Sequence, residues 1–137
     1  MCSGMVCISL VLVALVYTLM LRQLWEPKGL RRLVDIFLHD FIPLLFFIYW
    51  WLSVAGQRLA WHSLLLWLLY PISYLAFVFV AGSLLGSYPY PFLQADHLGY
   101  GRVLLNSFGL LAFYSFLGAV LLSLNRIKQC QSRKSLP

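Results

Sequence analysis

Long apolar blocks and short polar segments alternate along this chain. Four blocks, which cover about residues 6–24, 33–54, 61–85 and 103–124, carry few charged side chains, and Gly, Pro and basic residues separate them. A helix rises about 1.5 Å per residue, so about 20 apolar residues cross a hydrocarbon core of about 30 Å. The apolar residues form continuous blocks and not amphipathic stripes, which is typical of helices that face lipid. The sequence therefore predicts an all-α fold, a polytopic transmembrane helix bundle of four spans.

The first block has a second interpretation, as a signal peptide. A signal peptide needs basic residues before its apolar core and small residues at a cleavage site. No Lys or Arg precedes Arg22, and bulky side chains occupy residues 19–21. The sequence therefore favours a retained membrane span.

Two segments outside the blocks have distinct character. Residues 86–101 read GSYPYPFLQADHLGYG, and their prolines and glycines exclude a continuous helix, while their aromatic side chains suit a membrane surface. We expect an ordered interfacial loop there. Residues 126–137 form a basic polar tail, which we expect to be flexible. Pro71, inside the third block, predicts a kink in that helix.

Composition supports a membrane protein. Hydrophobic residues make up 62% of the chain and charged residues 10%, whereas a soluble domain carries about 25% charged residues. The net charge of +6 does not indicate nucleic-acid binding, because the basic residues flank the apolar blocks and form no stripe interleaved with aromatics. Anionic lipid headgroups are the expected partners of such clusters, and no nucleic acid is expected.

Charge does not decide the orientation in the membrane. With four spans, each side carries five basic residues: Arg58, Arg126, Lys128, Arg133 and Lys134 on one, and Arg22, Lys28, Arg31, Arg32 and Arg102 on the other. The rule that basic loops stay in the cytoplasm therefore gives no preference.

The second block contains ionisable residues, which are costly in a membrane and often functional. Asp35 and His39 are four residues apart, so they lie on one helical face within hydrogen-bonding reach, where the carboxylate can fix the imidazole tautomer. Asp40 lies about 100° around the helix from His39 and needs a partner of its own. Pro43 removes the backbone donor for the carbonyl of His39.

Two interpretations of this cluster stay open. In the structural one, Asp35 pairs with Arg31 or Arg32 near the headgroups and His39 is a packing residue. In the catalytic one, His39 is a general base, oriented by Asp35, in a lateral cavity of the bundle. The catalytic interpretation predicts a threonine or serine facing His39.

The other polar residues have plainer interpretations. His62 begins a span beside Trp61, as interfacial residues do. We expect His97 to form a solvated pair with Asp96 in the loop, and the alternative is that it closes over the mouth of a cavity. Asn106 and Ser107 are expected to hydrogen-bond between helices. The three cysteines and three histidines show no metal-ligand spacing, so the sequence implies no metal and no cofactor.

Three segments resemble a known family: DIFLHDFIPLL at 35–45, WLLYPISYL at 67–75 and YPYPFLQADHLGYGRVLLN at 88–106. They resemble the Pr-six-Pr family of bacterial multi-span membrane proteins. The resemblance implies six spans with both ends in the cytoplasm, of which this chain matches the last four. It implies an inner-membrane location, a cytoplasmic C-terminal tail and an N-terminal truncation of the gene or gene model.

The same pattern is similar, more distantly, to the androgen-induced and androgen-dependent membrane hydrolases of fatty-acid esters of hydroxy fatty acids. These enzymes use a threonine nucleophile and a histidine that precedes a proline within a span, and His39 with Pro43 matches that position. The threonine lies in an earlier span. Thr18, the only threonine of this chain, belongs to a different helix, so its role does not transfer.

The leading hypothesis is thus an integral membrane protein related to intramembrane hydrolases of lipid esters but lacking the span that bears the nucleophile. His39 and Asp35 are its candidate catalytic residues. The alternative is a non-enzymatic membrane component, a transport or accessory subunit that packs with other membrane helices and uses these polar pairs structurally. The sequence leaves open whether the chain is an enzyme.

Overall fold

The computed structural model describes residues 2–22, 28–55, 59–86, 88 and 90–134, and all regular structure among them is helical. The all-α prediction is confirmed for this part of the chain. Residues 23–27 and 56–58, which separate predicted spans, and Pro89 of the predicted loop lie outside the described residues. The chain divides into two compact units: unit 1 is Met1–Ala60 with Leu117–Pro137, and unit 2 is Trp61–Phe116.

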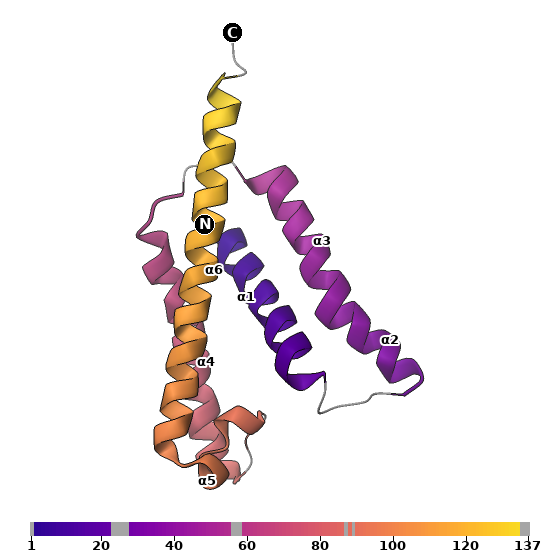
Figure 1. The fold of residues 1–137 in the computed structure, drawn as a ribbon, viewed down its shortest axis with the longest axis vertical. Coiled ribbons are helices and arrows are strands. Elements are labelled where there is room, and N and C mark those ends of the chain that lie inside the picture. Colours follow the sequence, from indigo (N-terminus) through magenta and orange to yellow (C-terminus); the bar gives the residue numbers. More distant parts are fainter. Residues whose placement is uncertain (1, 23–27, 56–58, 87, 89, 135–137) are drawn as a thin grey trace. The chain divides into compact units, whose positions relative to one another are not determined.

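Two long helical runs begin unit 1, and each contains wide π turns. The first comprises α1 (Cys2–Val16) and the π turn η1 (Tyr17–Leu21). The second extends from Leu30 to Val54 through α2 (Leu30–Ile36), the π turn η2 (Phe37–Phe41), α3 (Ile42–Tyr49) and the π turn η3 (Trp50–Val54). The two runs lie side by side, with α1 packed along α3 (Figure 1).

Proline explains the π turn in the middle of the second run. Pro43 lies two residues after the end of η2 and is buried in the first turn of α3. In a straight α-helix its ring would clash with the carbonyl of His39, four residues earlier. A wider turn relieves that clash, and the amide of Ile42 reaches the carbonyl of Phe37, five residues back. Such π turns are rare and often lie at functional sites.

Buried side chains and one lysine connect the elements of unit 1. Cys7, Ile8 and Trp50 are among its fully buried side chains. The Lys128 ammonium donates a hydrogen bond to the carbonyl of Trp51 and lies 5.2 Å from the centre of that indole ring. A cation at the carboxyl end of a helix is favourable because the last carbonyls there carry partial negative charge. Lys128 therefore ties the end of the second run to the C-terminal helix.

Unit 2 contains α4, the predicted interfacial loop and the first part of α6. Helix α4 (Ser63–Leu85) continues through Pro71 and ends at Gly86, whose φ of 64° suits glycine. The loop holds the 3₁₀ turn η4 (Pro91–Leu93) and the short helix α5 (Ala95–Leu98). Gly99, with φ of 76°, precedes α6 (Tyr100–Lys134). No continuous helix crosses the described part of this loop, as its prolines and glycines predict.

The loop packs onto the helices of its own unit. Val78, Leu93 and Val103, from α4, η4 and α6, form a buried cluster with aromatic neighbours. The Asn106 amide donates to the carbonyl of Phe92 at 2.9 Å. The Ser107 hydroxyl is buried, with no partner among the described residues. The loop is thus an ordered part of unit 2, held by apolar packing and by hydrogen bonds from α6 and, through Tyr74 and Tyr90, from α4.

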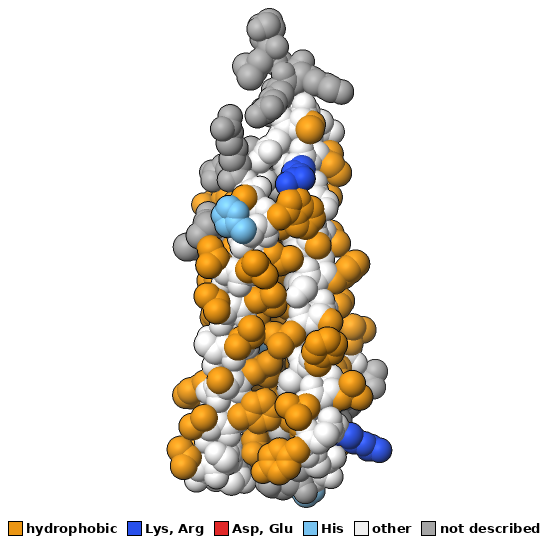
Figure 2. Space-filling view, turned by 90° about the vertical axis from the view of Figure 1, so that its left-hand side faces the viewer, with side chains coloured by type: hydrophobic (Ala, Val, Ile, Leu, Met, Phe, Trp, Pro, Cys, Tyr) orange, Lys and Arg blue, Asp and Glu red, His pale blue; other side chains and the backbone are white. Residues whose placement is uncertain are grey.

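Within the described ranges, four helical stretches are long and apolar enough to cross a membrane: Ser3–Leu21, Leu30–Val54, Ser63–Leu85 and Tyr100–Gln131. They match the predicted blocks, except that α6 continues to Lys134, about ten residues beyond the predicted end of the last span. The basic tail is therefore helical as far as it is described, because it contains no Gly or Pro before Pro137 and Lys128 is held at Trp51. Hydrophobic side chains are spread over the face drawn in Figure 2, with few Lys or Arg side chains among them.

Candidate functional site

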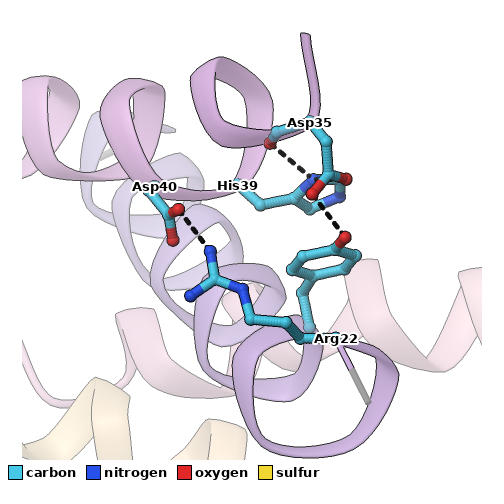
Figure 3. A network of polar contacts seen from close by, with 5 residues as sticks. Arg22, Asp35, His39 and Asp40 are labelled. Carbon is cyan, nitrogen blue, oxygen red and sulfur yellow. Dashed lines mark hydrogen bonds and ion pairs between the residues drawn. The ribbon is translucent and has the colours of Figure 1, made fainter. Parts of the chain in front are cut away.

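A carboxylate and an imidazole lie in contact on the second helical run. His39 Nδ1 is 3.1 Å from Asp35 Oδ1 and 3.1 Å from the backbone carbonyl oxygen of Asp35 (Figure 3). Both neighbours of Nδ1 are acceptors, so Nδ1 carries the proton and Nε2 of the neutral ring keeps its lone pair. Nε2 forms no hydrogen bond among the described residues. Asp35 therefore orients the imidazole with a proton acceptor facing away from the carboxylate.

Tyr17, on the π turn that ends the first run, closes over this pair. Its hydroxyl donates to Asp35 Oδ2 at 2.5 Å, and its ring stacks on the imidazole with centroids 3.8 Å apart and planes 14° apart. The side chain is buried, with 6% of its surface exposed. Both carboxylate oxygens of Asp35 are therefore in contact: His39 Nδ1, on the same helix, lies 3.1 Å from Oδ1, and the Tyr17 hydroxyl, from the first run, donates to Oδ2.

A second pair joins the same two runs. Arg22 Nη2 lies 2.5 Å from Asp40 Oδ2, and the guanidinium lies 5.9 Å from the centre of the Tyr17 ring. The Arg22 and Asp40 side chains are 45% and 37% exposed, whereas those of His39 and Asp35 are 26% and 16% exposed. The Arg22–Asp40 ion pair is therefore the more exposed part of the cluster, and Tyr17 with Asp35 is the more buried part.

The structure brings together the two residues that the spacing predicts, Asp35 and His39, and supplies Asp40 with Arg22 as its partner. It does not pair Asp35 with Arg31 or Arg32: among the described residues, the partners of Asp35 are Tyr17 and His39. Both arginines are exposed on α2. The ionic partner that the structural interpretation expected is thus replaced by a neutral phenol from the other helix.

The remaining histidines belong to unit 2. His62 precedes α4 and His97 lies in α5, and both side chains are exposed. The side chain of Asp96, the predicted neighbour of His97, lies outside the described residues. No group of three or more His, Cys, Asp or Glu with the spacing of a metal site occurs in the described part of the chain.

Tyr17 and Arg22 are the members of the site that sequence reasoning missed. The sequence holds a signal that could have found them: they are five residues apart at the end of an apolar block, where a hydroxyl and a cation can reach two acids on the next span. Thr18, the neighbour of Tyr17, is exposed, and His39 stacks on Tyr17 instead. No threonine or serine hydrogen-bonds to His39 among the described residues.

This geometry can accept and release a proton. A histidine whose Nδ1 is held by a carboxylate presents Nε2 as a base, and the carboxylate stabilises the imidazolium that results. Arg22 near Asp40 offsets the second negative charge next to the pair. The described residues thus supply a base and the group that orients it, without a side-chain nucleophile in contact.

The four apolar helices define the class of this chain, a multi-pass helical membrane protein. The chain matches no protein-family model, no curated protein and no solved structure. The resemblance to the Pr-six-Pr family and the hydrolases therefore stays a prediction from the sequence.

Proposed function

We propose that this protein contributes a general base to the hydrolysis of lipid esters within the membrane. His39 is the base and Asp35 orients it. The hydroxyl that attacks the ester comes from water or from a partner membrane helix. The observation that carries this proposal is the contact of His39 Nδ1 with Asp35 Oδ1 at 3.1 Å, which leaves Nε2 without a partner among the described residues.

The chemistry requires one proton acceptor near the ester carbonyl. Nε2 takes the proton of the attacking hydroxyl as its oxygen bonds to the carbonyl carbon, and it returns that proton to the departing alkoxide as the ester C–O bond breaks. With water as nucleophile, the products are a fatty acid and an alcohol. The resemblance supports a substrate of the class of fatty-acid esters of hydroxy fatty acids.

The test compares cell membranes that contain the full wild-type chain with membranes that contain its variants. Membranes are used so that any partner helix is present. Hydrolysis of an isotope-labelled fatty-acid ester of a hydroxy fatty acid is followed by mass spectrometry of the released acids. His39→Gln should lower the rate by about 100-fold, because a positioned base contributes at least that factor. His97→Gln, which alters an exposed histidine of unit 2, is the matched control and should keep the wild-type rate.

Equal rates for His39→Gln and the wild-type chain would contradict the proposal. So would a wild-type rate no higher than that of membranes without the chain.

The resemblance also supports a location in the bacterial inner membrane with the C-terminal tail in the cytoplasm, and we propose both.

A second candidate function is a non-enzymatic membrane component, such as a transport or accessory subunit that associates with other membrane helices. The observation that favours it is that both Tyr17–Asp35 and Arg22–Asp40 join the first helical run to the second. Polar pairs between helices stabilise membrane bundles without any chemistry. For this candidate, His39→Gln leaves ester hydrolysis unchanged and only lowers the stability of unit 1.

A further inference from the structure

We propose that Tyr17 is a positioning residue that holds the Asp35–His39 pair in its proton-accepting arrangement. This inference rests on the proposed function for its effect on catalysis, but its structural part stands on the contacts of Tyr17 alone. Tyr17 acts through Asp35 and His39, and no contact of its own with a reacting group is assumed.

The hydroxyl of Tyr17 distinguishes the two oxygens of Asp35. It occupies Oδ2 at 2.5 Å, so that Oδ1 remains for His39 Nδ1 at 3.1 Å. A carboxylate with only one of its oxygens engaged can rotate and exchange its oxygens between donors. A neutral donor on Oδ2 restricts that rotation. Because the donor carries no positive charge, it does not cancel the negative charge of Asp35, which still acts on the imidazole.

The ring of Tyr17 fixes the plane of the imidazole. The stacked rings are 3.8 Å apart and 14° from parallel, and Tyr17 is itself buried. Rotation of His39 about its side-chain bonds would break this stack together with both contacts of Nδ1. The stack therefore adds to the carboxylate in keeping Nε2 directed away from Asp35.

The charges around the stack favour an imidazolium that forms during proton transfer. Asp35 contacts the imidazole directly, and the Tyr17 ring presents its electron-rich face to it. The one neighbouring cation in the described cluster, Arg22, lies 5.9 Å from the Tyr17 ring and pairs with Asp40 at 2.5 Å. The positive charge of Arg22 is thus partly offset by Asp40.

Two substitutions separate the hydroxyl from the ring. Tyr17→Phe keeps the stacked ring and removes the bond to Asp35, whereas Tyr17→Leu removes both. Tyr70→Phe, on an exposed tyrosine of α4, is the matched control. The first measurement is proton NMR of the His39 ring in the full chain in lipid micelles, with His39→Gln used for assignment.

We expect the stacked ring of Tyr17 to shift the His39 ring protons upfield in the wild-type chain. That shift should persist in Tyr17→Phe and in Tyr70→Phe and be lost in Tyr17→Leu. A His39 spectrum that is unchanged in Tyr17→Leu overturns the inference. This measurement needs no enzymatic activity, so it tests Tyr17 even if the proposed hydrolysis fails.

The second measurement is ester hydrolysis in membranes, with kcat and KM determined separately. Tyr17→Phe should lower kcat about tenfold and leave KM unchanged, because a less firmly positioned base loses part of the at least 100-fold that it contributes. Equal kcat values in Tyr17→Phe and Tyr70→Phe contradict the catalytic part. Loss of hydrolysis in His39→Gln together with full activity in Tyr17→Phe would reject the role of Tyr17 and keep the proposed function.

Discussion

Individual side chains in the candidate site differ in how strongly they tie the two helices together. Tyr17 is buried and bonds to a carboxylate that also contacts His39. Arg22 and Asp40 form a short ion pair, but more than a third of each side chain is exposed. Long exposed side chains lose conformational freedom when they pair, which offsets much of the attraction. The ion pair should therefore contribute little to stability.

A double-mutant cycle tests this expectation. Arg22→Met, Asp40→Asn and the double variant are unfolded reversibly in mixed micelles, and the free energies of unfolding are compared. We expect a coupling energy of about 0.5 kcal/mol, similar to exposed ion pairs in water and to average polar contacts between membrane helices. A coupling energy several times larger would show that the pair is a principal tie between the first and second runs.

The helices depend on local backbone geometry that a change of one side chain can disturb. In unit 2, Gly82 of α4 leaves the space in which the ring of Tyr88 lies, and a Cβ at this position would overlap that ring. Tyr88 also packs against the cluster of Val78, Leu93 and Val103. Because the ring is held by these neighbours, extra volume at Gly82 should displace the loop from α4.

We therefore expect Gly82→Ala to lower the free energy of unfolding by about 1–3 kcal/mol, the usual cost of overpacking. Gly109→Ala, on α6, is the control, because a Cβ there meets no atom within 4 Å. It should leave stability unchanged or raise it by up to about 1 kcal/mol, because alanine forms helices more readily than glycine. Equal effects of the two substitutions in thermal or denaturant unfolding would contradict the packing of Tyr88 on Gly82.

Helix boundaries show how far the sequence predicts the fold. The four spans follow from apolar length alone, so the blocks and the helices agree closely. The end of α6 does not follow from hydropathy, because residues 125–134 are polar yet continue the helix, and Lys128 contacts a carbonyl from a segment distant in sequence. Hydropathy indicates which residues can lie in the lipid, but it does not indicate where a helix ends.

The candidate site was predictable only where its residues share one helix. Asp35 and His39 are four residues apart, and a helical period places them together. Tyr17 and Arg22 come from the first run, and their contacts depend on how the two runs align. No local pattern sets that alignment, so the structural interpretation pairs Asp35 with Arg31 or Arg32 on its own helix and does not predict the bond to a tyrosine 18 residues away.

The chain as a whole should cross the membrane four times, which places both of its ends on one side. Cysteine labelling tests this arrangement in a background in which the native cysteines are replaced by serine. Lys28→Cys and His97→Cys lie after the first and third spans, and Gln131→Cys lies at the end of the fourth. A thiol reagent that cannot cross membranes should label the first two from one side and the third only from the other. Labelling of all three from the same side would contradict four spans.

The central claim is that Asp35 holds His39 with its proton on Nδ1 and with Nε2 ready to accept another. Nitrogen-15 NMR of the full chain, labelled at histidine, tests it most directly, because protonated and unprotonated ring nitrogens resonate far apart. We expect neutral His39 to show a protonated Nδ1 and an unprotonated Nε2, and Asp35→Asn to weaken this preference. A neutral His39 with its proton on Nε2 in the wild-type chain would contradict the account.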